Sequence, residues 1–463
     1  MSTLSELHRA IGGRLRCSDA PGSADPSPLG PVQSDSRRIE PGNVFWALRG
    51  PNHHGEMFLD EAFRRGASGA VVSDESPRPE GRWMLQVSDA QQSLETWAQW
   101  RRRRSMAAVV AVTGSAGKTT ARQMIDAVLE SRLRGTASPG NFNNRIGVPL
   151  SMTAIEPEHD YAVLEMGASA PGEIAELAEL AWPQIGVITC VGDAHLGGFG
   201  SRQAIARAKA ELLAALPTDG AAVVADDPLL REAAGRCAAP VVWVGSDDRC
   251  DLRATDVESA RGRLTFTVDG CEFCVPVWGR HHLTAALCAL AVGRMFGIRL
   301  EEMADSLRAF RPMPMRCDVR EIGGATIIDD TYNSNPTAMR AALELLRDID
   351  APGRRIVICG DMAELGEQSI SLHDEMGRQI VDLGRAEWLV ACGEFSHQVV
   401  QGACAVGMPQ GHAISCPSVD QSVPYVCKTI SPGDVVLIKG SRKMCMERLV
   451  EAILGEKEQE AVA

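Results

Sequence analysis

The 463-residue chain lacks any apolar run long enough to cross a membrane. A spanning helix needs about 18 or more consecutive apolar residues, whereas the longest runs here, such as residues 106–112, have the length of a buried strand. The N-terminal segment, residues 1–13, is too polar for a secretory signal. These absences predict a cytoplasmic protein.

Positive charge is also scarce. Lys and Arg number 47 against 60 Asp and Glu, so the net charge is −13. That balance disfavours nucleic acid or an anionic membrane surface as the main partner. The basic run Arg101–Arg104 is too short to reverse it, and we expect this run to be a solvated helix end.

The 14 cysteines lack the spacing of a disulfide framework, which is typical of reduced cytosolic thiols. The C-x-x-C pair Cys271 and Cys274 falls on an expected hairpin that turns at residues 269–270. An offset of three on a strand puts the two thiols on opposite faces, which disfavours a zinc site at this pair.

The length predicts about three domains. Residues 1–105 mix short strands and helices, and Ser88 and Gln91 have the spacing of a capping box for a helix over 91–104. Residues 106–311 and 312–463 alternate apolar strands with helices, which is typical of doubly wound parallel sheets. We therefore expect an α/β chain with a small first domain, a central parallel-sheet domain and a C-terminal Rossmann-like domain.

The strongest single motif is V-T-G-S-A-G-K-T-T at residues 112–120, between an apolar strand and a helix. Its glycines allow a tight turn that aims N–H groups at phosphate oxygens, and the helix N-terminus adds positive charge. Lys118 would reach the phosphates, and the Thr119 hydroxyl would hold Mg²⁺. The motif predicts an ATP-binding loop of Gly114, Ser115, Ala116, Gly117, Lys118, Thr119 and Thr120. Val112 stands where a standard Walker A motif has its first glycine, which disfavours common kinases and GTPases.

Further segments, taken with this short loop, resemble the Mur ligase family along the whole chain. They read S-D-S-R at 34–37, P-G-N-V-F-W-A-L at 41–48, G-N-F-N-N at 140–144, L-E-M-G-A at 164–168, D-D-T-Y-N-S-N-P at 329–336, G-D-M-A-E-L-G at 360–366 and V-L-I-K-G-S at 436–441. The segments at 329–336 and 360–366 are similar to those of the branch that adds D-alanyl-D-alanine.

The resemblance implies ATP-dependent amide formation. The carboxylate of UDP-MurNAc-tripeptide would take the γ-phosphoryl group of ATP, and the amine of D-Ala-D-Ala would attack the acyl phosphate. Because two anions must approach each other, dense positive charge is needed between them. The cofactors implied are ATP and two Mg²⁺ ions, and the expected partners are these small molecules, with the chain a monomer. Residues 1–105 would bind the UDP substrate, 106–311 ATP, and 312–463 the incoming dipeptide.

The resemblance also implies roles for single residues. The expected metal ligands are Thr119, Glu165, His195 and Lys209, with Lys209 carbamylated by CO₂ to make it anionic, and the expected catalytic residues are Lys118, His195, Lys209 and Arg316. The nucleotide would also contact His281, Arg316, Asp330 and Tyr332. Substrate contacts would come from Ser36, Arg37, Asn143, Asn144, Asn333, Asn335, Asp361, Glu364 and His373.

The chain departs from the family pattern at residues 279–285, G-R-H-H-L-T-A. His282 and Ala285 stand there in place of two asparagines, one of which contacts adenine in the family.

Two alternatives stay open at this point. One is another amide ligase, such as a diaminopimelate- or lysine-adding Mur ligase or a folylpolyglutamate synthetase, although the latter lacks the first-domain segments. The other is a phosphate-loop protein without catalysis, for which the ligand set Glu165, His195 and Lys209 would be unnecessary.

Overall fold

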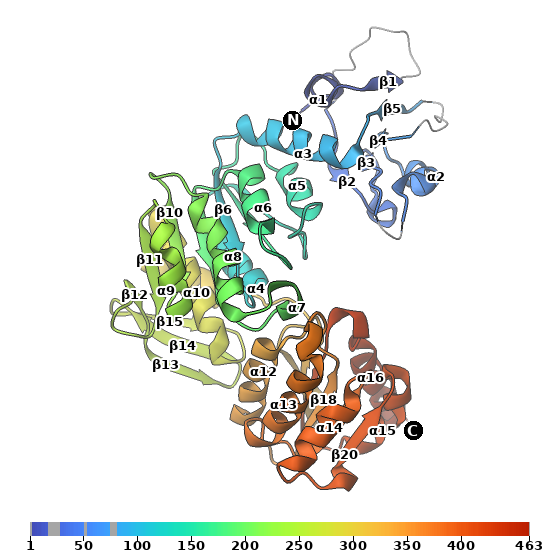
Figure 1. Ribbon diagram of the computed structural model, residues 1–463, viewed down its shortest axis with the longest axis vertical. Coiled ribbons are helices and arrows are strands. Elements are labelled where there is room, and N and C mark those ends of the chain that lie inside the picture. Colours follow the sequence, from blue (N-terminus) through green and yellow to red (C-terminus); the bar gives the residue numbers. More distant parts are fainter. Residues whose placement is uncertain (1, 17–27, 51–52, 75–80, 463) are drawn as a thin grey trace. The chain divides into compact units, whose positions relative to one another are not determined.

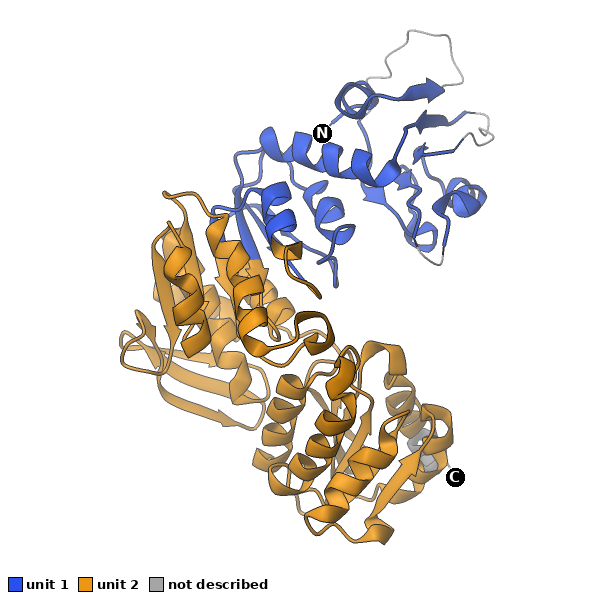
Figure 2. Cartoon of the chain, in the orientation of Figure 1, with its two compact units in different colours: residues 1–111, 132–167, 175–185 blue, residues 112–131, 168–174, 186–463 orange. Residues whose placement is uncertain are grey.

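The computed structural model describes residues 2–16, 28–50, 53–74 and 81–462 (Figure 1). By its internal contacts the chain divides into two compact units, coloured in Figure 2. The first contains residues 1–111, 132–167 and 175–185, and the second contains residues 112–131, 168–174 and 186–463. No helix in the described ranges is both long and apolar enough to span a membrane.

The first unit begins with a five-stranded sheet in the order β1-β5-β4-β3-β2, in which only β1 runs antiparallel to its neighbour. The strands are β1 (Arg14–Arg16), β2 (Val32–Gln33), β3 (Val44–Trp46), β4 (Gly69–Val72) and β5 (Trp83–Gln86). The helices are α1 (Leu4–Ile11), α2 (Leu59–Arg64) and α3 (Ala90–Arg103). Apolar residues on the two faces of this sheet form two separate clusters, as a sheet buried on both faces requires.

The start and the end of α3 correct two expectations from the sequence. The N-cap is Asp89, whose side chain accepts a hydrogen bond from the Gln92 amide, so Ser88 and Gln91 do not form a capping box. The basic run at its end is not wholly solvated. Arg102 is buried and donates to the Ala181 carbonyl at 3.0 Å, because the unpaired carbonyls at the end of another helix need donors.

A seven-stranded sheet follows in the chain, in the order β12-β11-β10-β9-β6-β8-β7. Its strands are β6 (Ala108–Thr113), β7 (Gly135–Ala137), β8 (Tyr161–Glu165), β9 (Ile185–Ile188), β10 (Ala221–Ala225), β11 (Val241–Gly245) and β12 (Leu252–Arg253). The helices over the same stretch are α4 (Lys118–Leu129), α5 (Gly147–Met152), α6 (Glu173–Ala181), α7 (Leu196–Phe199), α8 (Arg202–Ala214), α9 (Pro228–Ala233), α10 (Leu283–Met295) and α11 (Leu300–Arg308). The described pairs β7–β8, β10–β11 and β11–β12 are parallel, as predicted.

A three-stranded antiparallel sheet connects β12 to α10. It consists of β13 (Thr255–Ala260), β14 (Arg263–Val268) and β15 (Cys271–Val275). Val268 pairs with Cys271, and Asp269 and Gly270 both have positive φ, which confirms the predicted hairpin turn.

The C-terminal part of the second unit is a six-stranded sheet in the order β16-β17-β21-β18-β19-β20. The strands are β16 (Asp318–Ile322), β17 (Ala325–Asp330), β18 (Arg355–Gly360), β19 (Trp388–Cys392), β20 (Ala413–Cys416) and β21 (Val435–Lys439). The helices are α12 (Pro336–Asp348), α13 (Ser369–Asp382), α14 (Ser396–Ala405), α15 (Val419–Thr429) and α16 (Glu447–Val462). One apolar cluster joins the sheet to α12, α13 and α14, and another joins it to α15 and α16.

This arrangement confirms the predicted doubly wound sheet, with one antiparallel edge strand, β16, added to it. In such sheets, ligands bind outside the carboxyl ends of the parallel strands. The predicted site segments at 329–336 and 360–366 begin at the carboxyl ends of β17 and β18, and the segment at 436–441 runs through β21 and past its carboxyl end.

Candidate active site

The loop between β6 and α4 has a backbone that only glycine tolerates at two positions. Gly114 has φ +150° and Gly117 has φ +75°. A Cβ atom at Gly114 would lie 2.1 Å from the Thr189 hydroxyl oxygen. The glycines therefore let this loop approach the end of β9 and turn directly into α4.

The segment after β9 holds the loop in place. The Ser115 amide donates to the Cys190 carbonyl at 3.1 Å, and the Ala116 amide lies 3.2 Å from the Cys190 sulfur. The Thr189 hydroxyl donates to the Ala116 carbonyl at 2.6 Å. The Lys118 ammonium donates to the Gly114 carbonyl at 2.7 Å. Three hydrogen bonds with residues 189–190 and one from Lys118 thus hold the loop. Among the described residues no side chain caps the N-terminus of α4.

Arg316 brings a second cation to this loop. Its Nη2 donates to the Thr119 hydroxyl at 3.0 Å, and its guanidinium lies over the Tyr332 ring, 4.1 Å from the centroid. Its Nε is buried and has no acceptor among the described residues. The structure therefore presents an unused guanidinium donor beside the hydroxyl that the motif assigns to Mg²⁺, as a site for a phosphoryl group requires.

The backbone that carries Arg316 is strained and firmly held. Met315 and Cys317, on either side of it, both have positive φ, at +64° and +50°. The Tyr332 amide donates to the Met315 carbonyl at 3.1 Å, and the Cys317 amide donates to Asp330 Oδ1 at 3.2 Å. Left-handed conformations of this kind persist only where surrounding contacts impose them, and they concentrate at functional sites.

Asp330 is in turn fixed by a buried lysine. Lys439, 1% exposed at the end of β21, donates to Asp330 Oδ2 at 2.5 Å and to the Asn333 carbonyl at 2.8 Å. The family resemblance includes Lys439, in the segment at 436–441, but implied no role for it. A lysine that directly follows a run of apolar strand residues was the available signal, because such a residue is rarely buried without a partner.

Lys209 on α8 is a buried lysine of the second unit. Its side chain is 2% exposed, its Nζ lies 3.5 Å from the Ala168 carbonyl, and the Phe199 ring centroid is 5.6 Å away. Burial, followed by repulsion from Lys118, lowers the pKa of Lys209 to about 7. A large part of this lysine is therefore an uncharged amine near neutral pH.

His195 and Glu364, both predicted site residues, pair with each other. The Nδ1 of His195 contacts the Glu364 carboxylate, and the Gly197 amide donates to the Glu364 carbonyl at 3.0 Å. The hydrogen bond from His195 lowers the pKa of Glu364, which keeps the carboxylate charged. This pair joins the start of α7 to the loop that follows β18.

The other predicted residues of the C-terminal sheet hold its loops. Asn335 caps α12 through the Ala338 amide, and its Nδ2 lies 3.4 Å from the Ser115 carbonyl of the phosphate loop. Asp361 accepts hydrogen bonds from the Glu394 and Phe395 amides.

Two further side chains in this region also bond to backbone. His373 is fully buried, accepts from the Met362 amide and donates to the Ser369 carbonyl. Asn333 accepts from the amide of Ser334 at 2.9 Å. Asp361, His373 and Asn333 therefore have structural bonds, and their substrate contacts stay predictions.

In the first unit, Glu165 is buried at the end of β8 and accepts a hydrogen bond from Asn143 Nδ2 at 2.8 Å. The Asn144 side-chain oxygen accepts hydrogen bonds from the amides of Ile146 and Gly147 in the following turn.

Ser36 and Arg37 lie on another part of the first unit, in a 3₁₀ helix, η1 (Ser36–Arg38). Ser36 donates to Glu61 at 3.0 Å, whereas Arg37 is exposed and pairs with Asp35 at 2.8 Å. The Arg37 guanidinium lowers the pKa of Asp35, so the carboxylate stays charged. Both residues thus bond within the first unit, and their contact with the UDP substrate stays a prediction.

Comparison with known proteins defines the class. Residues 112–293 match the Mur ligase middle domain, and residues 315–442 match the Mur ligase glutamate ligase domain. The chain belongs to the Mur ligase family.

Several proteins similar to this chain are D-alanyl-D-alanine-adding ligases of this family. The UDP-N-acetylmuramoyl-tripeptide–D-alanyl-D-alanine ligase of Bacillus subtilis is 33% identical over 91% of this chain and 93% of its own length. The MurF structure from Acinetobacter baumannii is 28% identical, with a TM-score of 0.83 over 98% of both chains. The MurF ligase of Thermotoga maritima in complex with ADP is 29% identical, with a TM-score of 0.77 over 93% of this chain and 99% of its own.

The Lys439–Asp330 pair yields the first prediction. Lys439→Met removes the cation but leaves Asp330 buried, so we expect the free energy of unfolding to fall by about 3–5 kcal/mol, measured by urea denaturation. The double variant Lys439→Met/Asp330→Asn removes both charges and should recover part of this loss. Lys428→Met, at an exposed lysine on α15, is the control and should leave stability unchanged. A loss below about 1 kcal/mol for Lys439→Met alone would show that the pair is not structurally important.

Proposed function

We infer that this chain is an ATP-dependent ligase that joins D-alanyl-D-alanine to UDP-N-acetylmuramoyl-tripeptide in peptidoglycan precursor synthesis. The observation that carries this inference is the 33% identity to a ligase of that name over nine-tenths of the chain. The built phosphate loop with Arg316 at Thr119 agrees with it. A non-catalytic phosphate-loop protein would have no use for a buried lysine with a pKa near 7 at this place.

The reaction requires a carboxylate to become an electrophile. Transfer of the γ-phosphoryl group to the substrate carboxylate supplies a leaving group, and the dipeptide amine then displaces phosphate from the acyl phosphate. Lys118 and Arg316 provide the positive charge that lets two anions meet. Arg316 suits this role because its planar guanidinium can grip phosphate through two N–H groups.

Nucleotide binding is assigned to the loop Gly114, Ser115, Ala116, Gly117, Lys118, Thr119 and Thr120, with His281, Asp330 and Tyr332 toward the base and ribose. The rigid placement of Asp330 by Lys439 supports this assignment, because a pre-positioned acceptor binds a ribose hydroxyl with less ordering cost. A MurF relative has been solved with ADP.

Mg²⁺ fits the hard-oxygen chemistry expected here. Thr119, His195 and Lys209 are the second-unit residues that would hold it, Glu165 stays a predicted ligand from the sequence, and bound Mg²⁺ would neutralise phosphate charge. Lys209 suits this set only as a carbamate. Its uncharged amine would attack CO₂, form an N–C bond and release one proton to solvent, which turns a neutral amine into an anionic oxygen ligand.

We assign a different ligand to each of the three blocks of the chain. Residues 1–105 would bind the UDP substrate through Ser36 and Arg37. Residues 106–311 would bind ATP, with Asn143 and Asn144 contacting the muramoyl peptide, and residues 312–463 would bind the dipeptide. In the last block, Asn333, Asn335, Asp361, Glu364 and His373 are the proposed contacts. The cytoplasmic location and the monomeric state stay predictions.

The activity is tested by incubating the full chain with ATP, Mg²⁺, UDP-MurNAc-tripeptide and one amine at a time. We expect phosphate release with D-Ala-D-Ala and none with diaminopimelate, lysine or glutamate, because the amine must fit the C-terminal block. Release with a single amino acid but not with the dipeptide would instead support another Mur ligase or a folylpolyglutamate synthetase.

Lys209 gives a sharper prediction. Lys209→Ala should lower the turnover number at least about 100-fold, equivalent to about 2.7 kcal/mol of activation free energy, because an anionic ligand is lost. Short carboxylic acids added to this variant should restore part of the rate by supplying carboxylate oxygens. Lys428→Ala should keep the wild-type rate. An unchanged rate in Lys209→Ala would rule out the carbamate.

A further inference from the structure

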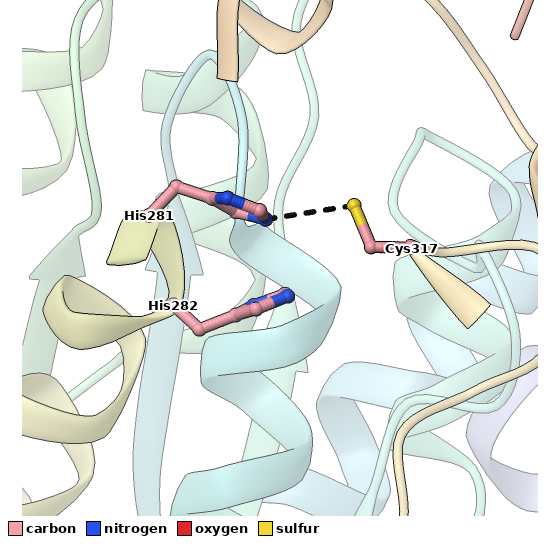
Figure 3. Close-up of side chains that lie close together, drawn as sticks. All are labelled: His281, His282 and Cys317. Carbon is pink, nitrogen blue, oxygen red and sulfur yellow. Dashed lines mark hydrogen bonds between the residues drawn. The ribbon is translucent and has the colours of Figure 1, made fainter. Parts of the chain in front are cut away.

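His281, His282 and Cys317 come together although His281 and Cys317 are 36 positions apart in the sequence (Figure 3). The histidines lie on a 3₁₀ helix, η4 (Arg280–His282), just before α10, and Cys317 precedes β16. One ligand atom from each residue lies within 4.8 Å of the other two. The set contains two imidazole nitrogens and one sulfur, which are the donors that zinc prefers.

The geometry points to a binding site for a borderline-soft divalent cation, Zn²⁺ or Co²⁺, formed by His281, His282 and Cys317. The site shares no residue with the proposed Mg²⁺ ligands Thr119, Glu165, His195 and Lys209, and it offers no oxygen ligand, which Mg²⁺ prefers. It does share His281 with the proposed nucleotide contacts, so metal binding is tested without nucleotide.

The distance between the His281 nitrogen and the Cys317 sulfur supports a tetrahedral site. Zinc binds imidazole nitrogen at about 2.0–2.1 Å and thiolate sulfur at about 2.3 Å, so a tetrahedral angle places these two ligand atoms about 3.6 Å apart. His281 Nε2 and Cys317 Sγ form a hydrogen bond of 3.6 Å, so a cation could take the place of the proton between them without separating the two side chains. Figure 3 shows the thiol directed at the His281 ring from the opposite side of the cluster.

His282 provides the second observation. The residue is largely buried, with 7% exposed. Its ring lies beside that of His281, with centroids 4.1 Å apart, and one of its nitrogens lies within 4.8 Å of the ligand atoms of His281 and Cys317. A cation at the centre of the cluster would therefore take its second imidazole ligand from a ring that packing already holds in place.

The backbone also presents these side chains to one another. A Cβ atom at Gly279 would lie 2.5 Å from His281 Cε1, so only glycine there lets the ring fold back over η4. Cys317 is held at φ +50° by the hydrogen bond from its amide to Asp330. On binding, the Cys317 thiol would give up its proton to solvent as the metal–sulfur bond forms, while both histidines bind as neutral imidazoles.

An occupied site would tie η4 to the strand that follows Arg316. Because Cys317 is the next residue after Arg316, the cation would hold the backbone that aims the guanidinium at Thr119. Three protein ligands leave one position open for water or another donor.

Metal binding is tested with the purified, metal-free full chain in excess Mg²⁺. Cobalt serves as the spectroscopic probe. We expect one equivalent of Co²⁺ to give a thiolate-to-metal charge-transfer band, and one equivalent of Zn²⁺ to remove it. Cys317→Ser should abolish the band, whereas Cys271→Ser, at a half-buried cysteine of the C-x-x-C pair, should keep it.

A second variant tests the site in case Cys317→Ser loses the band only because it misfolds. His281 is exposed, so His281→Gln should fold, which circular dichroism checks, and should weaken Co²⁺ affinity more than about tenfold. Zn²⁺ should also raise the melting temperature of the wild type and of Cys271→Ser but not of Cys317→Ser. The site is ruled out if the wild type shows no band, if the band survives in Cys317→Ser, or if His281→Gln binds Co²⁺ as tightly as the wild type.

Discussion

The hydrogen bond from Arg316 to the Thr119 hydroxyl connects the phosphate loop to the C-terminal block, and much of the site is arranged around it. Lys439 fixes Asp330, Asp330 fixes the Cys317 amide, and the strained backbone on both sides of Arg316 follows from these contacts. Asp330 and Lys439 lie at the carboxyl ends of the parallel strands β17 and β21, and Arg316 and Cys317 directly precede β16, whose first residue pairs with Asp329 near the end of β17. Sheet topology thus brings these distant segments together.

Net charge and site charge are independent in this molecule. The chain carries −13 overall, yet its reaction needs cations between two anions. The structure meets this need locally, with Lys118, Lys209 and Arg316 near one loop, and burial keeps Lys209 from adding a full charge. The net charge therefore disfavours nucleic acid as a partner, but it gives no information about the chemistry of the phosphate loop at residues 112–120.

Sequence patterns predicted the parallel sheets, the hairpin at residues 269–270 and the phosphate loop, because each depends on local signals such as apolar strands and glycine turns. They could not predict the role of Lys439 or Cys190, whose functions depend on partners 109 and 74 residues away in the chain. For the same reason, the cluster of His281, His282 and Cys317 is visible only in three dimensions. The cap of α3 was misassigned because Ser88 and Asp89 are both good N-caps, and only the backbone decides between them.

The most direct test of the connection through Arg316 is steady-state kinetics of Arg316→Ala and Arg316→Lys with ATP, UDP-MurNAc-tripeptide and D-Ala-D-Ala. If the guanidinium grips the phosphoryl group during transfer, Arg316→Ala lowers kcat at least about 100-fold with little change in the KM for the dipeptide, and Arg316→Lys recovers only part of the loss. An unchanged kcat in a variant that melts like the wild type would contradict this role.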